Sequence, residues 1–128
     1  MATVTPKITL TSSDLLSQNL NLSVSASITA SHTTGLARAP ITSTAIGTTS
    51  GQVTLYTADD FAAIAYLYIK NTDTTATNYV YVYTASNNWL KLAGGDWAFL
   101  PTIADDTLKA YAATSGTIVE WMVFGTDQ

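Results

Sequence analysis

Two neighbouring stretches read Tyr66-Leu67-Tyr68-Ile69-Lys70 and Tyr79-Val80-Tyr81-Val82-Tyr83, with a polar segment between them. Side chains alternate between the two faces of a β-strand, so each stretch predicts one aliphatic and one aromatic face. Because the intervening residues are turn formers, we expect the two stretches to form one hairpin. Its aliphatic face would hold Leu67, Ile69, Val80 and Val82.

The two faces of this predicted hairpin leave two interpretations open. If the aliphatic face lies in the core, five rings point outward, which is more apolar surface than a monomer usually exposes. Tyrosine is enriched at interfaces because its large ring carries a polar group. In the alternative, the rings are buried and their hydroxyls bind the backbone. We carry the first interpretation forward, in which the tyrosines lie at an interface with another subunit or protein: Tyr66, Tyr68, Tyr79, Tyr81 and Tyr83.

The rest of the chain also has the pattern of short strands. Leu20 to Ala30 alternates apolar with small polar residues, as a half-buried strand does. Turn formers at 93–96 and 114–117 predict two further hairpins, and the stretch 118–124 is apolar on both faces except at Glu120, which indicates a central strand. Eight or nine short antiparallel strands at this spacing are typical of an all-β sandwich or a jelly-roll-like fold.

Length and residue pattern also predict the domain organisation. A chain of 128 residues is long enough for one core, so residues 12–128 are expected to form a single domain. Residues 1–11 read as an extended N-terminal arm or an edge strand, because Pro6 cannot donate to a β-ladder. The candidate contact residues of this arm are Thr3, Val4, Ile8 and Leu10.

Charge and composition argue against several classes of function. The formal net charge is −4, only 11% of residues are charged, and there is no cysteine. Binding to nucleic acid or to an anionic membrane surface needs a basic patch on the protein, so neither partner is expected. There is no disulfide or thiolate metal site to consider. The N-terminal sequence has no apolar run of signal-peptide length, and no segment is long and apolar enough to span a membrane.

Side chains suited to catalysis are few. The chain has one histidine, His32, in a Ser/Thr-rich loop, and one glutamate, Glu120. The acidic pairs Asp59-Asp60 and Asp105-Asp106 lack the spacing of a calcium loop and are expected to start turns. For Glu120 we expect a structural or interface ion pair, with Lys109 or Lys91 as its partner across a hairpin. The prediction is therefore a protein with no enzymatic activity, no metal and no cofactor.

Two tryptophans flank the Gly94-Gly95 turn. Trp89 and Trp97 are core residues, interface anchors or sugar-stacking platforms, and the sequence leaves these open. As possible exposed aromatic contacts they are the candidate residues for a binding module.

From about Phe61 onward the chain resembles small β-structured virion proteins of tailed bacteriophages. The resemblance covers about half of the chain and has no catalytic signature. It consists of a strand ending in Lys-Asn, a Leu-x-x-Gly turn before an apolar strand, and a Ser-Gly turn into a Glu-containing strand. These elements are Ala65–Thr72, Trp89–Pro101 and Ala112–Trp121.

The resemblance implies a non-enzymatic virion structural protein, made in the host cytoplasm. The first expectation is a capsid decoration (cement) protein at the capsid surface, bound to itself as a homotrimer and to the major capsid protein. The alternative is a receptor- or carbohydrate-binding module of a tail, neck or head fibre, which would use Trp89, Trp97 and Asp96.

Overall fold

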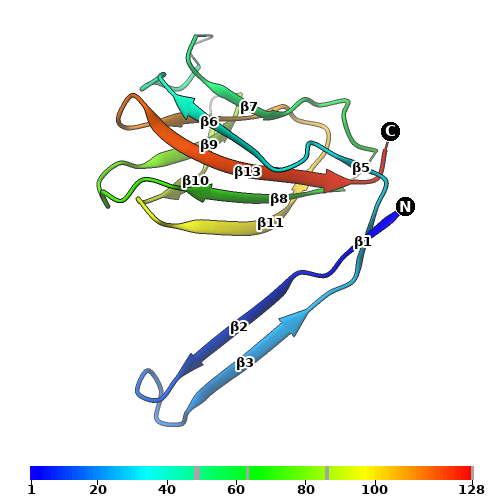
Figure 1. The fold of residues 1–128 in the computed structure, drawn as a ribbon, viewed down its shortest axis with the longest axis vertical. Coiled ribbons are helices and arrows are strands. Elements are labelled where there is room, and N and C mark those ends of the chain that lie inside the picture. The colour runs from blue at the N-terminus through cyan, green and yellow to red at the C-terminus, as the bar shows by residue number, and fades with distance from the viewer. Residues whose placement is uncertain (48–49, 63, 86, 128) are drawn as a thin grey trace. The chain divides into compact units, whose positions relative to one another are not determined.

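The structure is a computed structural model that describes residues 1–47, 50–62, 64–85 and 87–127, apart from the side chain of Ile103. Within these residues the chain forms thirteen strands in antiparallel sheets and no helix (Figure 1). The all-β fold class expected from the Thr-, Val- and Tyr-rich composition is confirmed. By its internal contacts the chain divides into two compact units, Met1–Ser31 and His32–Gln128.

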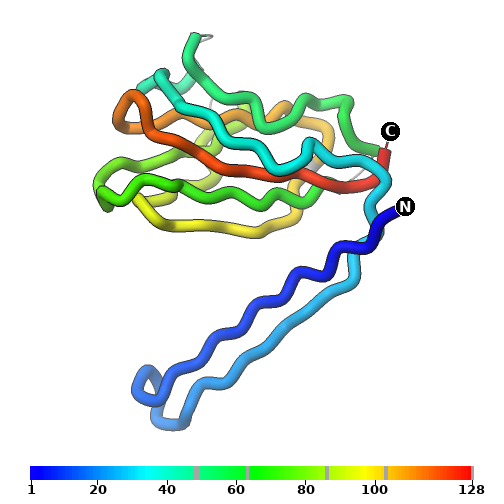
Figure 2. Tube along the Cα trace, in the orientation of Figure 1, coloured from blue at the N-terminus to red at the C-terminus, as the bar shows by residue number. Residues whose placement is uncertain are grey.

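The first unit contains β1 (Ala2–Val4), β2 (Lys7–Ser12), β3 (Leu20–Ser25) and β4 (Ile28–Ala30). β2 and β3 lie side by side along their whole length, and β1 pairs with β4 (Figure 2). The predicted single strand at Leu20 to Ala30 is therefore two strands. The break faces Pro6, which has no N–H to donate, and its carbonyl accepts a hydrogen bond from the Ala26 N–H at 3.2 Å.

Residues 1–11, which the sequence assigned to an arm or edge strand, supply β1 and most of β2. Both strands are paired inside the first unit, and residues 12–31, which the sequence placed in the main domain, belong to the same unit.

The second unit consists of two larger sheets. Its strands are β5 (His32–Thr33), β6 (Ala37–Ile41), β7 (Val53–Tyr56), β8 (Ile64–Asn71), β9 (Val80–Thr84), β10 (Asn87–Leu92), β11 (Trp97–Ile103), β12 (Leu108–Ala112) and β13 (Thr117–Gly125). The four-stranded sheet has the order β10-β9-β12-β7. The five-stranded sheet has the order β11-β8-β13-β5, with β6 also paired to β13. β13 is central, as its two apolar faces predicted.

The two sheets of the second unit share one hydrophobic core. The aliphatic faces of β8 and β9 are fully buried in it, which agrees with the interpretation that placed the aliphatic face in the core. Buried residues of β6, β7, β8, β9, β10, β12 and β13 contribute to this core, including Leu67, Ile69, Val80, Val82, Leu108, Val119 and Val123. From β11, the partly buried Ala98 and Leu100 pack against it. The tyrosines of the same two strands therefore point away from the shared core.

The predicted tyrosine hairpin is wrong. β8 pairs with β11 and β13, whereas β9 pairs with β10 and β12, so the two tyrosine strands belong to different sheets. The other two predicted hairpins are wrong for the same reason, because β10 and β11, and likewise β12 and β13, lie in different sheets. A turn signal shows that the chain reverses, but it does not show whether the next strand pairs with the last one or crosses to the facing sheet.

Candidate functional site

The β2–β3 hairpin carries an aliphatic face that the first unit does not cover. Ile8 lies opposite Val24 and Leu10 lies opposite Leu22, so their side chains share one face. Leu20, opposite Ser12, extends this row. Leu10 is 49% and Val24 is 55% exposed. We call these five residues the aliphatic hairpin face: Ile8, Leu10, Leu20, Leu22 and Val24.

The opposite face of the same hairpin is polar, with pairs such as Thr9 and Ser23. Lys7 and Asp14 are the two charged side chains of residues 1–31, and neither belongs to the aliphatic hairpin face. An isolated two-stranded hairpin has marginal stability in water and needs an apolar face covered. Of the predicted arm contacts, Ile8 and Leu10 lie on this face, while Thr3 and Val4 lie in β1 and pair with Thr29 and Ile28 of β4.

Tyr79, which directly precedes β9, and Tyr81 of β9 form a row with Tyr111 of β12, which the sequence did not single out, and we call these three residues the tyrosine row. Tyr81 lies opposite Tyr111 of β12, and the two rings stack with centroids 4.8 Å apart. The Lys91 ammonium lies 3.9 Å from the centre of the Tyr79 ring, a cation–π contact. Tyr79 and Tyr81 are half-buried, and their rings lie side by side with centroids 6.4 Å apart.

The outward tyrosines of β8 belong to a second aromatic group on the other sheet. Tyr66 stacks on Phe124 of β13 and on Phe99 of β11, with centroids 5.7 and 6.2 Å apart. The Tyr68 hydroxyl donates a hydrogen bond to Glu120 Oε1 at 3.0 Å. Burial, and then this bond and the charge of Glu120, raise the pKa of Tyr68. The five predicted tyrosines are thus separated into two surfaces, because their strands lie in two sheets.

The partner of Glu120 differs from the prediction. Arg38 Nε of β6 lies 3.3 Å from Glu120 Oε2, and neither Lys109 nor Lys91 forms this ion pair. Both lysines lie in the four-stranded sheet, whereas Glu120 lies on β13 of the five-stranded sheet. The sequence could not place β6 beside β13, because residues 31–51 carry no clear strand pattern.

The two tryptophans also lie in different sheets. Trp89 of β10 is partly buried and packs against the shared core, whereas Trp97 of β11 is 57% exposed beside Lys70. They do not form one aromatic platform. Asp96, the third residue proposed for such a site, accepts a hydrogen bond from the Ala93 N–H at 3.0 Å and so closes its own turn.

The groups considered for catalysis or metal binding are dispersed. His32 Nδ1 lies 3.9 Å from Asp127 Oδ1, and its ring packs against Phe61. In the part of the chain that the structure describes, no three histidine or acidic side chains come together as a metal site would require. No helix able to cross a membrane occurs among those residues.

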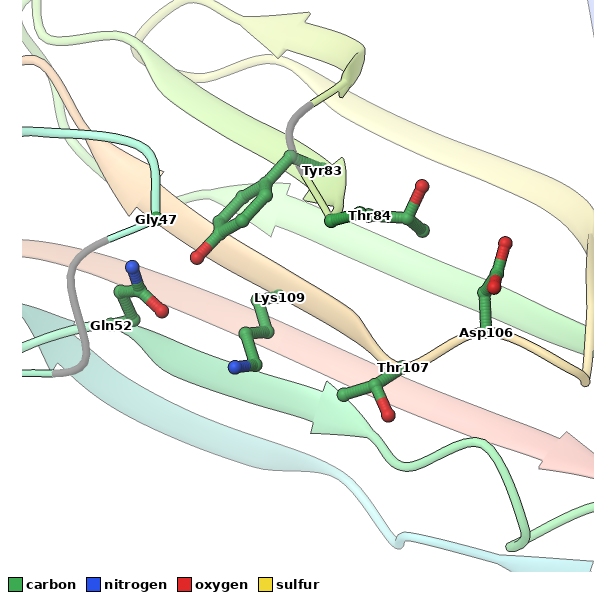
Figure 3. A pocket seen from close by; sticks show the side chains of 8 residues that line it. Gly47, Gln52, Tyr83, Thr84, Asp106, Thr107 and Lys109 are labelled. Carbon is green, nitrogen blue, oxygen red and sulfur yellow. The ribbon is translucent and has the colours of Figure 1, made fainter.

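A polar pocket opens on the four-stranded sheet, where β9 ends and β12 begins (Figure 3). Its volume is about 360 Å³. Tyr83, the last of the predicted tyrosines, forms one wall and is only 2% exposed. Burial raises the pKa of its phenol, and the neighbouring Gly47 backbone and Gln52 side chain oppose that rise. The polar pocket is lined by Gly47, Gln52, Tyr83, Thr84, Ala85, Asp106, Thr107 and Lys109.

Ala85, at the rim of the polar pocket, has a φ of +48°, which L-residues with a side chain rarely adopt. We expect the Ala85→Gly variant to be more stable by about 1 kcal/mol, since glycine adopts this conformation without the steric cost of Cβ. Urea unfolding would measure the gain. Ala113→Gly is the control, because Ala113 is exposed and does not have a positive φ, and this exchange should give no gain in stability. A loss of stability in Ala85→Gly would contradict the expected strain.

No model of a known protein family matches this chain, and no curated protein sequence matches it.

Proposed function

We propose that this chain is a non-enzymatic structural protein of a tailed-bacteriophage virion. In this proposal it is a capsid decoration protein that binds the major capsid protein at the capsid surface and assembles as a homotrimer. Its second unit would be a jelly-roll-like β-sandwich that supplies a stable body. The first unit would supply the contact that joins it to the shell or to a neighbouring protomer.

The observation that carries this proposal is the aliphatic hairpin face. Four of its side chains, Ile8, Leu10, Leu22 and Val24, are between 38% and 55% exposed, and they lie in directly opposed pairs. Completing their burial would contribute about 1 kcal/mol for each side chain, or about 4 kcal/mol per protomer. A contact of this size is weak alone, but many copies on one shell would add through avidity.

The backbone of the hairpin supports the same role. β2 and β3 form a two-stranded sheet, so each has one edge free of strand pairing within the described residues. A capsid subunit or neighbouring protomer whose own sheet has an unpaired edge could pair with β2 or β3 through backbone hydrogen bonds. Such pairing places little demand on side-chain identity. The low content of charged side chains also suits a surface that is covered in an assembly.

A double substitution on the hairpin tests the proposal. Leu10→Thr with Leu22→Thr keeps strand-forming residues but removes two opposed aliphatic side chains from the face. We expect the wild-type protein to have the mass of a trimer by light scattering and to bind shells of its phage that lack it. The double variant should lose most of both properties.

The matched control is Thr9→Val with Ser23→Thr, an opposed pair on the polar face of the same hairpin. It should assemble and bind as the wild type does. If the aliphatic double variant binds shells as tightly as the wild type, the hairpin is not the contact, and if the wild type binds no shell, the decoration role is wrong.

A further inference from the structure

The polar pocket has the composition of a sugar-binding site, a role beyond that of a shell component. We propose that it binds one neutral sugar residue of a glycan. Its volume of about 360 Å³ is within the range of small-molecule sites. Tyr83 and Ala85 provide an apolar wall, and the other side chains provide donors and acceptors for hydroxyl groups.

The two charged residues of the pocket indicate a neutral ligand. Lys109 carries one positive charge and Asp106 one negative charge, so the lining has no net charge. Among the described residues neither forms an ion pair, and Figure 3 shows their charged ends pointing in different directions. A carboxylate or phosphate on the ligand would approach Lys109 but would be repelled by Asp106. A sugar hydroxyl donates to a carboxylate and accepts from an ammonium, so it satisfies both.

The remaining polar groups are placed by the fold. The Thr107 hydroxyl accepts a hydrogen bond from the Ala58 N–H at 3.1 Å, and its own proton is still available to a ligand oxygen. Gln52, which directly precedes β7, and Thr84 of β9 complete the lining. Because burial and neighbouring strands fix several of these side chains, little ordering would be needed on binding.

A peptide ligand is disfavoured by the same geometry. An extended peptide binds to a sheet by pairing with an unpaired strand edge. β9 is paired with β10 and β12, and β12 is paired with β9 and β7, so neither offers an edge at the pocket. The tyrosine row continues from the pocket, since the Tyr83 and Tyr111 rings are in edge contact at 5.5 Å. Asn88, which donates to the Tyr111 hydroxyl at 3.1 Å, lies beside it, and further sugar residues of a glycan would lie along this row.

The test is a titration of the isotope-labelled protein followed by NMR. The probes are the methyl glycosides of glucose, galactose, mannose and N-acetylglucosamine, with glucuronate as the charged comparison. We expect at least one neutral glycoside to shift the Gln52, Thr107 and Lys109 signals saturably, with a Kd in the range of about 1 mM. Asp106→Asn and Lys109→Met should each weaken that binding about tenfold, since each removes a charged hydrogen-bond partner.

Asp105→Asn and Lys70→Met are the matched controls, because they make the same charge changes outside the pocket lining and away from the tyrosine row. Both should bind the glycoside as the wild type does, and the spectra will show that all four variants are folded. The proposal is overturned if no neutral glycoside gives saturable shifts up to about 100 mM, far above the millimolar range expected for a single sugar. It is also overturned if glucuronate alone binds, or if the Asp106 and Lys109 variants bind unchanged. The aliphatic hairpin face is intact in every variant, so the result is independent of shell binding.

Discussion

The Asn71→Ala variant is expected to lose about 3 kcal/mol of unfolding free energy, because the change leaves buried backbone groups without partners. Asn71 ends β8 and is fully buried. Its side-chain amide donates to the Asn78 carbonyl at 2.6 Å and to the Leu92 carbonyl at 3.1 Å. Its side-chain oxygen accepts from the Asp73 N–H at 3.1 Å. One side chain thus joins a strand of the five-stranded sheet to the open end of the β9–β10 hairpin, where β9 begins and β10 ends.

Urea unfolding of the wild type and the variant would measure this loss. Asn87→Ala is the control, because Asn87 is exposed at the start of β10 and should lose less than about 0.5 kcal/mol. Asn71→Asp keeps an acceptor oxygen but lacks the amide donors, so it should also be strongly destabilised. A loss below about 1 kcal/mol in Asn71→Ala would show that water replaces the amide and that the junction does not depend on it.

The Gly94→Ala variant is expected to lose about 2 to 4 kcal/mol through a steric clash with backbone. A Cβ on Gly94 would lie 2.7 Å from the carbonyl carbon of Thr75 and 3.0 Å from the carbonyl oxygen of Asp73. Thr75 and Asp73 lie in the loop between β8 and β9, which cannot move away easily because its own hydrogen bonds hold it. The Asp73 carboxylate accepts hydrogen bonds from the Thr75 N–H at 2.8 Å and the Asn78 side chain at 2.9 Å.

Gly95→Ala separates this clash from backbone strain. Gly95 has a φ of +89°, and a Cβ there would meet no atom within 4 Å. Its replacement should cost about 1 kcal/mol, from the unfavourable backbone conformation alone. Thermal unfolding of the two neighbouring variants gives the comparison directly. Equal losses would mean that the 72–78 loop gives way to the added methyl group.

Both predictions concern the end of the second unit where β8 leads to β9 and β10 leads to β11. The Asn71 N–H donates to the Asp96 carbonyl at 2.9 Å, and the Gly95 N–H donates to the Asn71 carbonyl at 3.0 Å. These bonds join the two crossing connections to each other. The junction therefore joins the two sheets at this end of the second unit.

Alternation along single strands predicted which side chains share a face, although it left open which of the two faces is buried. The sequence assigned four residues to the aliphatic face, and all four are fully buried: Leu67, Ile69, Val80 and Val82. The apolar stretch around Glu120 predicted a central strand, and β13 is central. These predictions succeed because the direction of a side chain is a local property of an extended backbone.

The sequence did not predict the polar pocket, although it contained each of its residues. Tyr83 was read as one of five equivalent tyrosines, yet it is 2% exposed while Tyr81 is half-buried. Asp106 was read only as a turn residue. The pocket joins side chains from three separate parts of the chain, and no pattern within one part shows that they meet.

By itself the sequence determined the all-β class and, for strands such as β8 and β9, which side chains share a face, because these depend on composition and on a period of two. Only the tertiary structure decided the partners of each strand. It placed β8 and β9 in different sheets, paired Glu120 with Arg38 and brought the pocket residues together. Strand pairing depends on which distant segments cover one another's apolar faces and satisfy one another's backbone groups. It is therefore a property of the whole fold and not of any single segment.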